Sequence, residues 1–260
     1  MPKEKVKTMQ GGLVPLAIFI FWLAGSTFGA WNRFLIPSPM DVLNACYHLL
    51  GSGELTRHVA VSLGRVAAGF TLAFLLAFPL AALLGMQRQY YGWVQPTLEF
   101  VRHIPPLAAI PMLILWFGIG EAPKLIVVLL ATFFPIFLNT LHGVTQCDER
   151  WIEVGKSFRF SRWSIFRRII LPAALPSMLV GMRLGLGYSW RAIIGAELIA
   201  ASSGIGYMIL DAEQLSRPDV VVLGMLIIGI VGSFVDWLFF RLAKNYTPWK
   251  ESEAVDNAKY

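Results

Sequence analysis

The chain has 260 residues, of which 56% are hydrophobic and only 15% are charged, and its mean hydropathy is +0.61. Soluble domains usually carry about 25% charged residues, and one core of this size could not hide so much apolar surface from water. The formal net charge is +6, but the basic residues lie between apolar runs rather than on one polar domain with aromatic residues, which argues against nucleic-acid binding. The composition therefore predicts an all-α protein embedded in a lipid membrane.

Six apolar segments are long enough to cross a bilayer, which takes about 20 residues of helix. They are residues 12–30, 60–86, 98–118, 122–145, 173–200 and 219–241. The basic segment 1–11 precedes the first of them without a convincing cleavage site, so we expect a retained first helix rather than a removed signal peptide. We therefore expect about six transmembrane helices within a membrane domain over residues 12–246, followed by a polar tail over 247–260.

Basic residues near the ends of the segments indicate the orientation, because cytoplasmic loops hold an excess of Lys and Arg. One set of loops contains Lys3, Lys5, Lys7, Arg88, Arg102, Arg150, Lys156, Arg159, Arg162, Arg167, Arg168, Arg241, Lys244 and Lys250. The opposite loops carry little net positive charge, so both termini are predicted to be cytoplasmic. Cys46 and Cys147 then lie on opposite sides, which excludes a disulfide between them. Ser38 and Pro39 begin an expected helix on the outer surface.

The loop over about 146–172 is too long, too regular and too basic for a simple connection. Trp151, Phe158, Ile165 and Ile169 recur at near-helical intervals, which predicts short amphipathic helices that present basic and aromatic groups. Physical chemistry alone leaves two interpretations open. One is an anchor for anionic lipid, and the other is a surface that docks a protein.

The same loop resembles the signature of the bacterial permeases of ATP-binding-cassette (ABC) importers. That signature opens with Glu-Ala-Ala, has Gly six residues after the Glu, and ends with Ile-x-Leu-Pro. Glu153 holds the first position here, and Ile169, Leu171 and Pro172 hold the end in register. The departures are Val154 and Gly155 in place of the alanines, and Arg159 in place of the glycine. Arg159 implies either a longer helix or a strained turn.

Three further segments are similar to the permease branch that serves sulfonates, taurine, nitrate and bicarbonate. They are Arg102–Pro111, Leu115–Gly120 and Ala196–Tyr207. The resemblance extends from about Ile36 to the last helix. It implies a permease of the type I importer fold in a bacterial inner membrane, with a small organic anion such as an aliphatic sulfonate or taurine as the leading substrate. The alternatives are nitrate, bicarbonate or an aromatic acid.

The resemblance also implies the partners. Two copies of the chain would enclose one path through the lipid, an extracytoplasmic binding protein would deliver substrate, and a cytoplasmic ATPase dimer would bind ATP and Mg. This chain would then hold no cofactor and would not be an enzyme. The residues implied to dock the ATPase are Glu153, Gly155, Lys156, Phe158, Arg159, Ser161 and Arg162. Gly155-Lys156-Ser157 is not a phosphate-binding loop, because Arg150 stands where that motif needs Gly.

Ionisable residues inside a span are costly and are candidates for a transport path or for a buried pair. The fifth segment contains Arg183, Arg191 and Glu197. Our path hypothesis has Arg191 or Arg183 attracting an anionic substrate and Trp190 forming an apolar constriction. The structural alternative has Arg183 extending toward the cytoplasmic interface and Glu197 fixing an outer gate.

Asn139 and His103 are weaker candidates for the path. A hydrogen bond between helices is the expected role of Asn139, and a solvated or capping role is expected for His103. We expect no metal site, because no second ligand is placed near His103. Two other classes of membrane protein would show different sequence patterns. A secondary transporter driven by ion coupling would show inverted repeats, and a membrane enzyme would need paired carboxylates or a His/Cys cluster; the sequence displays neither pattern.

Overall fold

The computed structural model describes residues 2–246, with side chains from residue 13 onward. The expected tail over 247–260, with Lys250, therefore lies outside the described residues. The side chains of Lys3, Lys5 and Lys7 lie outside them as well. The described chain is helical with short connections. Its elements are α1 (Pro2–Thr27), α2 (Pro39–Gly51), α3 (Glu54–Met86), α4 (Arg88–Arg102), η1 (Pro106–Ala109), α5 (Ile110–Phe117), α6 (Glu121–Thr145), α7 (Glu149–Ser157), α8 (Arg162–Ile165), η2 (Phe166–Ile170), α9 (Leu171–Ala200), α10 (Ile205–Gln214) and α11 (Pro218–Lys244).

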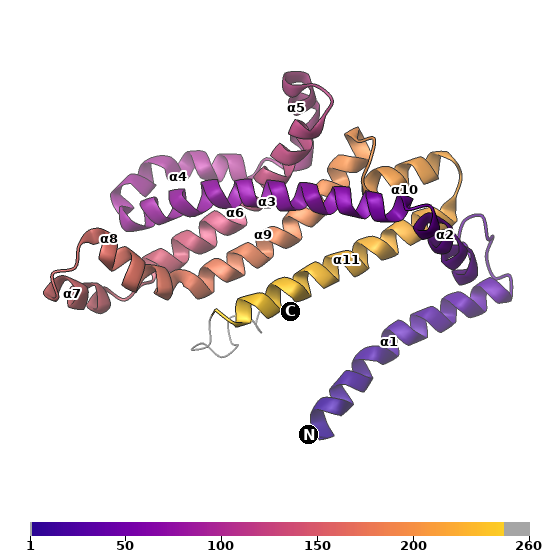
Figure 1. Cartoon of the computed structure of the whole chain (residues 1–260), viewed down its shortest axis with the longest axis horizontal. Coiled ribbons are helices and arrows are strands. Elements are labelled where there is room, and N and C mark those ends of the chain that lie inside the picture. The colour runs from indigo at the N-terminus through magenta and orange to yellow at the C-terminus, as the bar shows by residue number, and fades with distance from the viewer. Residues whose placement is uncertain (1, 247–260) are drawn as a thin grey trace.

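Helices α3, α6, α9 and α11 run along the long axis of the molecule, and α6 packs against both α3 and α9 (Figure 1). Small residues permit this close approach. A Cβ atom at Gly143 of α6 would lie 2.9 Å from the carbonyl oxygen of Ala174 in α9. Helices α7 and α8 lie at one end of the bundle, α2 and α10 lie at the other, and α1 extends away from the bundle, which it contacts near α2 (Figure 1).

Four helical segments in the described chain are long and apolar enough to cross a membrane: α3, α6, the continuous run Arg162–Ala200, and α11. The expected span over 98–118 was wrong as a single helix. It is divided into α4 and the η1–α5 segment, which are bent by 81° and count as a fifth span only when taken together. Pro105 and Pro106 explain the break, because each lacks a backbone N–H and a proline disfavours helical geometry in the residue before it.

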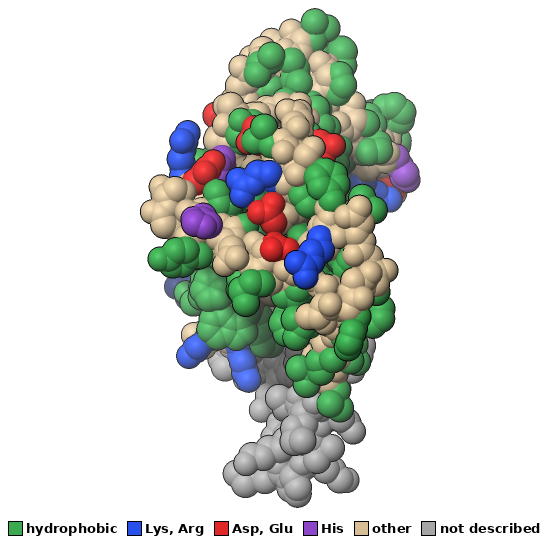
Figure 2. All heavy atoms as spheres, turned by 90° about the vertical axis from the view of Figure 1, so that its right-hand side faces the viewer, with side chains coloured by type: hydrophobic (Ala, Val, Ile, Leu, Met, Phe, Trp, Pro, Cys, Tyr) green, Lys and Arg blue, Asp and Glu red, His purple; other side chains and the backbone are tan. Residues whose placement is uncertain are grey.

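Helix α2 begins where the sequence predicts. Ser38 and Asp41 form a capping box, in which the Asp41 backbone N–H donates to Ser38 Oγ at 3.2 Å and the Ser38 N–H donates to Asp41 Oδ2 at 2.9 Å. Hydrogen bonds from the side chain and then the backbone of Ser38 lower the pKa of Asp41. The end that carries α2 and α10 displays side chains of both charges among apolar ones (Figure 2).

Candidate functional site

The loop between α6 and α9 forms two short helices joined by a tight turn. Asp148 caps α7 by accepting a hydrogen bond from the Arg150 N–H at 2.9 Å, and Ser161 caps α8 by accepting one from the Ser164 N–H at 3.2 Å. Arg159 lies in the turn with φ = 53°, in the left-handed region. Of the two alternatives drawn from the sequence, the structure has the strained turn, and α7 ends at Ser157.

One face of this loop is buried against the bundle. Gly155 lies against the next helices, because a Cβ atom there would be 2.7 Å from Ile169 Cδ1 and 3.3 Å from Ile165 Cγ1. Ile165 and Phe166 join Cys147 and Val144 in one apolar cluster. The missing methyl group at Gly155 therefore allows α7 to pack closely on the start of the α9 segment.

The opposite face is open and combines aromatic with charged groups. Trp151, Phe158 and Trp163 expose 63%, 72% and 67% of their surface. The remaining candidates on this loop are also exposed, namely Glu153, Lys156, Arg159, Ser161 and Arg162. Among the described residues, no hydrogen bond or ion pair engages the Glu153 carboxylate. Exposed aromatic side chains beside unpaired charges are typical of a surface that binds another molecule.

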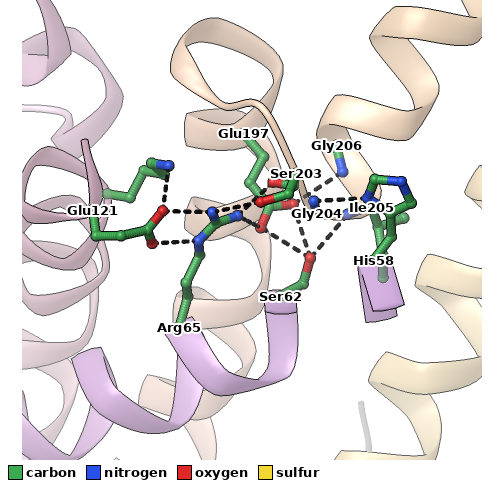
Figure 3. Close-up of polar contacts among 10 residues, drawn as sticks. His58, Ser62, Arg65, Glu121, Glu197, Ser203, Gly204, Ile205 and Gly206 are labelled. Carbon is green, nitrogen blue, oxygen red and sulfur yellow. Dashed lines mark hydrogen bonds and ion pairs between the residues drawn. The ribbon is translucent and has the colours of Figure 1, made fainter. Parts of the chain in front are cut away.

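A buried polar network lies toward the other end of the bundle, and its centre is Arg65 of α3 (Figure 3). Arg65 donates to both carboxylate oxygens of Glu121, at 2.6 and 2.7 Å, and to Glu197 Oε1 at 2.7 Å. Lys124 Nζ donates to Glu121 Oε1 at 2.8 Å. Arg65 is 6% exposed and Glu197 is fully buried. Two positive and two negative groups thus offset one another, which makes the burial of Arg65, Lys124 and Glu197 tolerable; the Glu121 side chain is itself 57% exposed.

The same network caps the start of α10. The Gly206 N–H donates to Glu197 Oε2 at 3.0 Å, the Ile205 N–H donates to Ser62 Oγ at 2.9 Å, and the Gly204 N–H donates to His58 Nδ1 at 3.0 Å. Arg65 also donates to the Ser203 carbonyl oxygen at 2.6 Å. Side chains from α3 and α9 therefore hold the 201–204 turn and satisfy the first N–H groups of α10 (Figure 3).

Sequence reasoning missed most of this network. Glu197 was a candidate, but Arg65, Ser62, His58 and Lys124 were not. A signal was present, since Arg65 is an ionisable residue within the expected span 60–86 and falls under the rule that singled out Glu197. The same holds for Asp236 in the last span.

The path candidates on α9 fall into two groups. Arg183 is engaged by Asp236 of α11, with hydrogen bonds of 2.8 and 2.7 Å, and lies over the Phe240 ring at 5.2 Å. Trp190 is nearly buried between α9 and α11, and its Nε1 donates to the Ile228 carbonyl oxygen at 3.2 Å. Arg191, by contrast, is exposed. Glu197 belongs to the buried network and not to the surroundings of Arg191.

The weaker candidates have local partners. Asn139 does not bond another helix as expected, because its Nδ2 donates to the Pro135 carbonyl oxygen of its own helix at 2.9 Å. The facing position on α9 is Gly181, which packs on the Asn139 Cβ and offers no side-chain partner. His103 is exposed at the C-cap of α4, with its Nδ1 2.6 Å from the Glu99 carbonyl oxygen.

A bundle of apolar helices with an exposed aromatic and basic loop at one end is the architecture of a multi-pass membrane protein. Residues 68–248 match the family described as the binding-protein-dependent transport system inner membrane component, and the chain belongs to that family. It is therefore a multi-pass permease subunit of an ABC importer in the bacterial inner membrane. In this family the membrane subunit is not an enzyme, and it works together with an ATPase and a binding protein.

Several named relatives are similar over nearly the whole chain. A Bacillus subtilis protein named as an aliphatic sulfonates transport permease is 35% identical, with 96% of this chain and 91% of that protein covered. The taurine transport system permease of Escherichia coli is 32% identical, with 95% and 92% covered. The bicarbonate transport system permease of Synechococcus elongatus is 32% identical, with 94% of each chain covered.

A solved structure shares the fold. The chain matches a chain in an inward-facing conformation of the MetNI methionine ABC transporter, with a TM-score of 0.61 and 18% identity. The match covers 74% of this chain and 96% of the other. This similarity establishes the architecture, which agrees with the type I importer fold expected from the sequence.

Proposed function

We propose that two copies of this chain form the membrane path of an importer for a small organic anion, with an aliphatic sulfonate or taurine as the leading substrate. A cytoplasmic ATPase dimer binds ATP and Mg, and this chain carries no cofactor of its own. An extracytoplasmic binding protein delivers the substrate. The names of the sulfonate and taurine relatives support this substrate class. Nitrate, bicarbonate and aromatic acids are the alternatives.

The observation that carries the proposal is the exposed face of α7 and α8. Trp151, Phe158 and Trp163 offer apolar anchors for a groove on the ATPase, and the free Glu153 carboxylate offers a charged contact. The α8 helix continues through the π-helical turn Phe166–Ile170 into α9 without a break. A displacement of the docked loop would therefore move α9 as a unit, which is the type of rigid coupling that a rocking transporter needs.

The distribution of charge supports cytoplasmic termini. Arg88, Lys156 and Arg167 belong to helix ends and loops at the α7–α8 end of the bundle, and Lys244 ends α11, which runs from the α10 end toward the α7–α8 end (Figure 1). The other end carries acidic and basic side chains together (Figure 2). A one-sided excess of Lys and Arg marks the cytoplasmic side.

The exposed apolar surface supports a second copy. Helix α4 has no buried residue, and Trp93 and Phe100 on it are 86% and 71% exposed. Leu115 and Ile119, in and after α5, are exposed as well. Lipid alone covers such surfaces in a monomer, whereas a path for a polar solute needs protein on every side.

The test is purification of the tagged chain in mild detergent, identification of the proteins that accompany it, and an ATPase assay. We expect an ATPase subunit to accompany the wild-type chain in stoichiometric amount. In Glu153→Ala and in Phe158→Ala, we expect this subunit to be lost or its ATP hydrolysis to be uncoupled from transport. Phe34→Ala is the matched control, because Phe34 is a similarly exposed aromatic residue in the segment before α2, at the opposite end of the bundle. A protein that purifies without an ATPase and still moves solute without ATP would refute the proposal and favour a secondary transporter.

A further inference from the structure

Three arginines lie deep in the spanning helices, and they differ in their partners. Arg65 is held by Glu121 and Glu197, and Arg183 is held by both oxygens of Asp236. Within the described chain no carboxylate or hydrogen-bond acceptor engages Arg191. Its guanidinium lies only over the Tyr188 ring, 5.8 Å from the ring centre.

An unpaired guanidinium nine residues from the end of a spanning helix is expensive in lipid. A second observation accounts for its position, since Arg191 lines three separate cavities in the part of the chain that the structure describes. Two of them, of 410 and 280 Å³, also contain Asp236, and the third, of 670 Å³, contains Trp116, Phe134 and Leu184. The side chain therefore borders open volume rather than packed protein.

The cavities around Arg191 differ in the polarity of the side chains that line them. Asp236 lines the first two cavities and Arg183 lines the 410 Å³ one; this pair is electrically neutral, and both oxygens of the Asp236 carboxylate accept hydrogen bonds from Arg183. The 670 Å³ cavity is lined mostly by apolar side chains, among them Leu138 and Leu130. A ligand beside Arg191 thus meets a positive charge that no carboxylate of the described chain compensates, next to a large and mostly apolar volume that Arg102 also borders.

We propose that Arg191 binds the head group of a singly charged oxyanion during transport and that the 670 Å³ cavity takes the hydrocarbon part of the same molecule. Tyr188 is a positioning residue, because its ring supports the guanidinium. This inference rests on the proposed function and narrows its substrate class to alkanesulfonates. Taurine fits less well, since its ammonium group would enter the apolar cavity without a partner.

The test uses proteoliposomes that contain the permease with its ATPase and its binding protein, and it measures uptake of radiolabelled hexanesulfonate. We expect Arg191→Gln to lower the initial rate about tenfold or more, because a charge-assisted contact is lost. Arg191→Lys keeps the charge but not the planar fork, so it should recover part of the rate. Assembly and basal ATPase activity should stay normal in both.

Arg241→Gln is the matched control. Arg241 also lies over an aromatic ring, that of Trp237 at 5.4 Å, but it is near the end of α11 and lines none of these cavities. Its replacement should leave uptake unchanged. Unaltered uptake in Arg191→Gln would overturn the inference while leaving the importer intact. Absence of ATP-driven uptake of any sulfonate by the wild-type complex would instead overturn the proposed function, and the inference with it.

Two further experiments test which molecule Arg191 binds. Unlabelled hexanesulfonate should compete with the labelled compound better than methanesulfonate and better than taurine, and Arg191→Gln should weaken competition by all three. Equal competition by taurine would contradict the role of the apolar cavity. An anionic lipid has the same chemistry as the proposed ligand, so uptake is compared with and without phosphatidylglycerol. An Arg191→Gln defect confined to vesicles with phosphatidylglycerol would assign Arg191 to lipid and overturn the inference.

Discussion

Arg65 and Glu197 are 132 residues apart in the chain and form an ion pair of 2.7 Å in which the carboxylate is completely buried. The pair joins α3 to α9, and the other carboxylate oxygen of Glu197 accepts a hydrogen bond from the Gly206 N–H in the first turn of α10. A single carboxylate thus links two spanning helices and the turn at their end. Its removal should disturb all three elements together.

Glu197→Gln should destabilise the protein strongly. Removing one member of a buried pair leaves the other charge without compensation, which costs about 3–5 kcal/mol. Glu121 retains both of its hydrogen bonds with Arg65, so the loss should lie toward the lower end of that range. The measurement is the apparent Tm of the purified protein in detergent, with Glu213→Gln, an exposed change on α10, as the control.

The double variant Arg65→Gln, Glu197→Gln separates the pair from the individual side chains. If the two residues act together, the double variant should lose less than the sum of the single changes. Strict additivity of the shifts in Tm would show that the two side chains contribute independently and would contradict the coupling described here.

Gly204→Ala should release the turn before α10. Gly204 has φ = 115°, which L side chains rarely adopt, and a Cβ atom there would meet the Glu197 carboxylate. The substitution should therefore lower the Tm by an amount comparable to Glu197→Gln. Gly64→Ala on α3 is the control, because a Cβ atom at Gly64 meets nothing within 4 Å and alanine favours helix. Equal Tm values for Gly204→Ala and Gly64→Ala would show that the turn tolerates a side chain.

The long helices were predictable because runs of about 20 apolar residues leave few alternatives in lipid. The start of α2 was equally readable, since Ser38 and Pro39 form a recognisable capping sequence. The sequence contains Pro105 at the position of the break, but the apolar residues around it favoured the prediction of one continuous span. The pairing of Arg65 with Glu197 was not accessible, because it depends on which faces of α3 and α9 meet, and one sequence does not report contacts between distant residues.

Arg159→Gly should stabilise the turn between α7 and α8. Arg159 has φ = 53°, where a residue with a Cβ atom is strained by about 1–2 kcal/mol. Glycine removes that strain but adds freedom to the unfolded chain, so the net gain should be up to about 1 kcal/mol. Arg159→Ala keeps the strain and removes only the charged side chain. A higher Tm for the glycine variant than for the alanine variant would establish the backbone effect, and equal values would refute it.

Cys147 should react slowly with a maleimide near neutral pH. The thiol is buried beside α7, and this burial, with a smaller contribution from Asp148, raises its pKa. Since only the thiolate reacts, the rate should continue to increase at a pH where an ordinary thiol has levelled off. The comparison is Ser157→Cys in a chain whose native cysteines are replaced by serine, because residue 157 is exposed on the same loop. If Cys147 and the cysteine at position 157 gave the same rate and the same dependence on pH, α7 would not cover Cys147 in solution, and the packing of the loop on the bundle would be refuted.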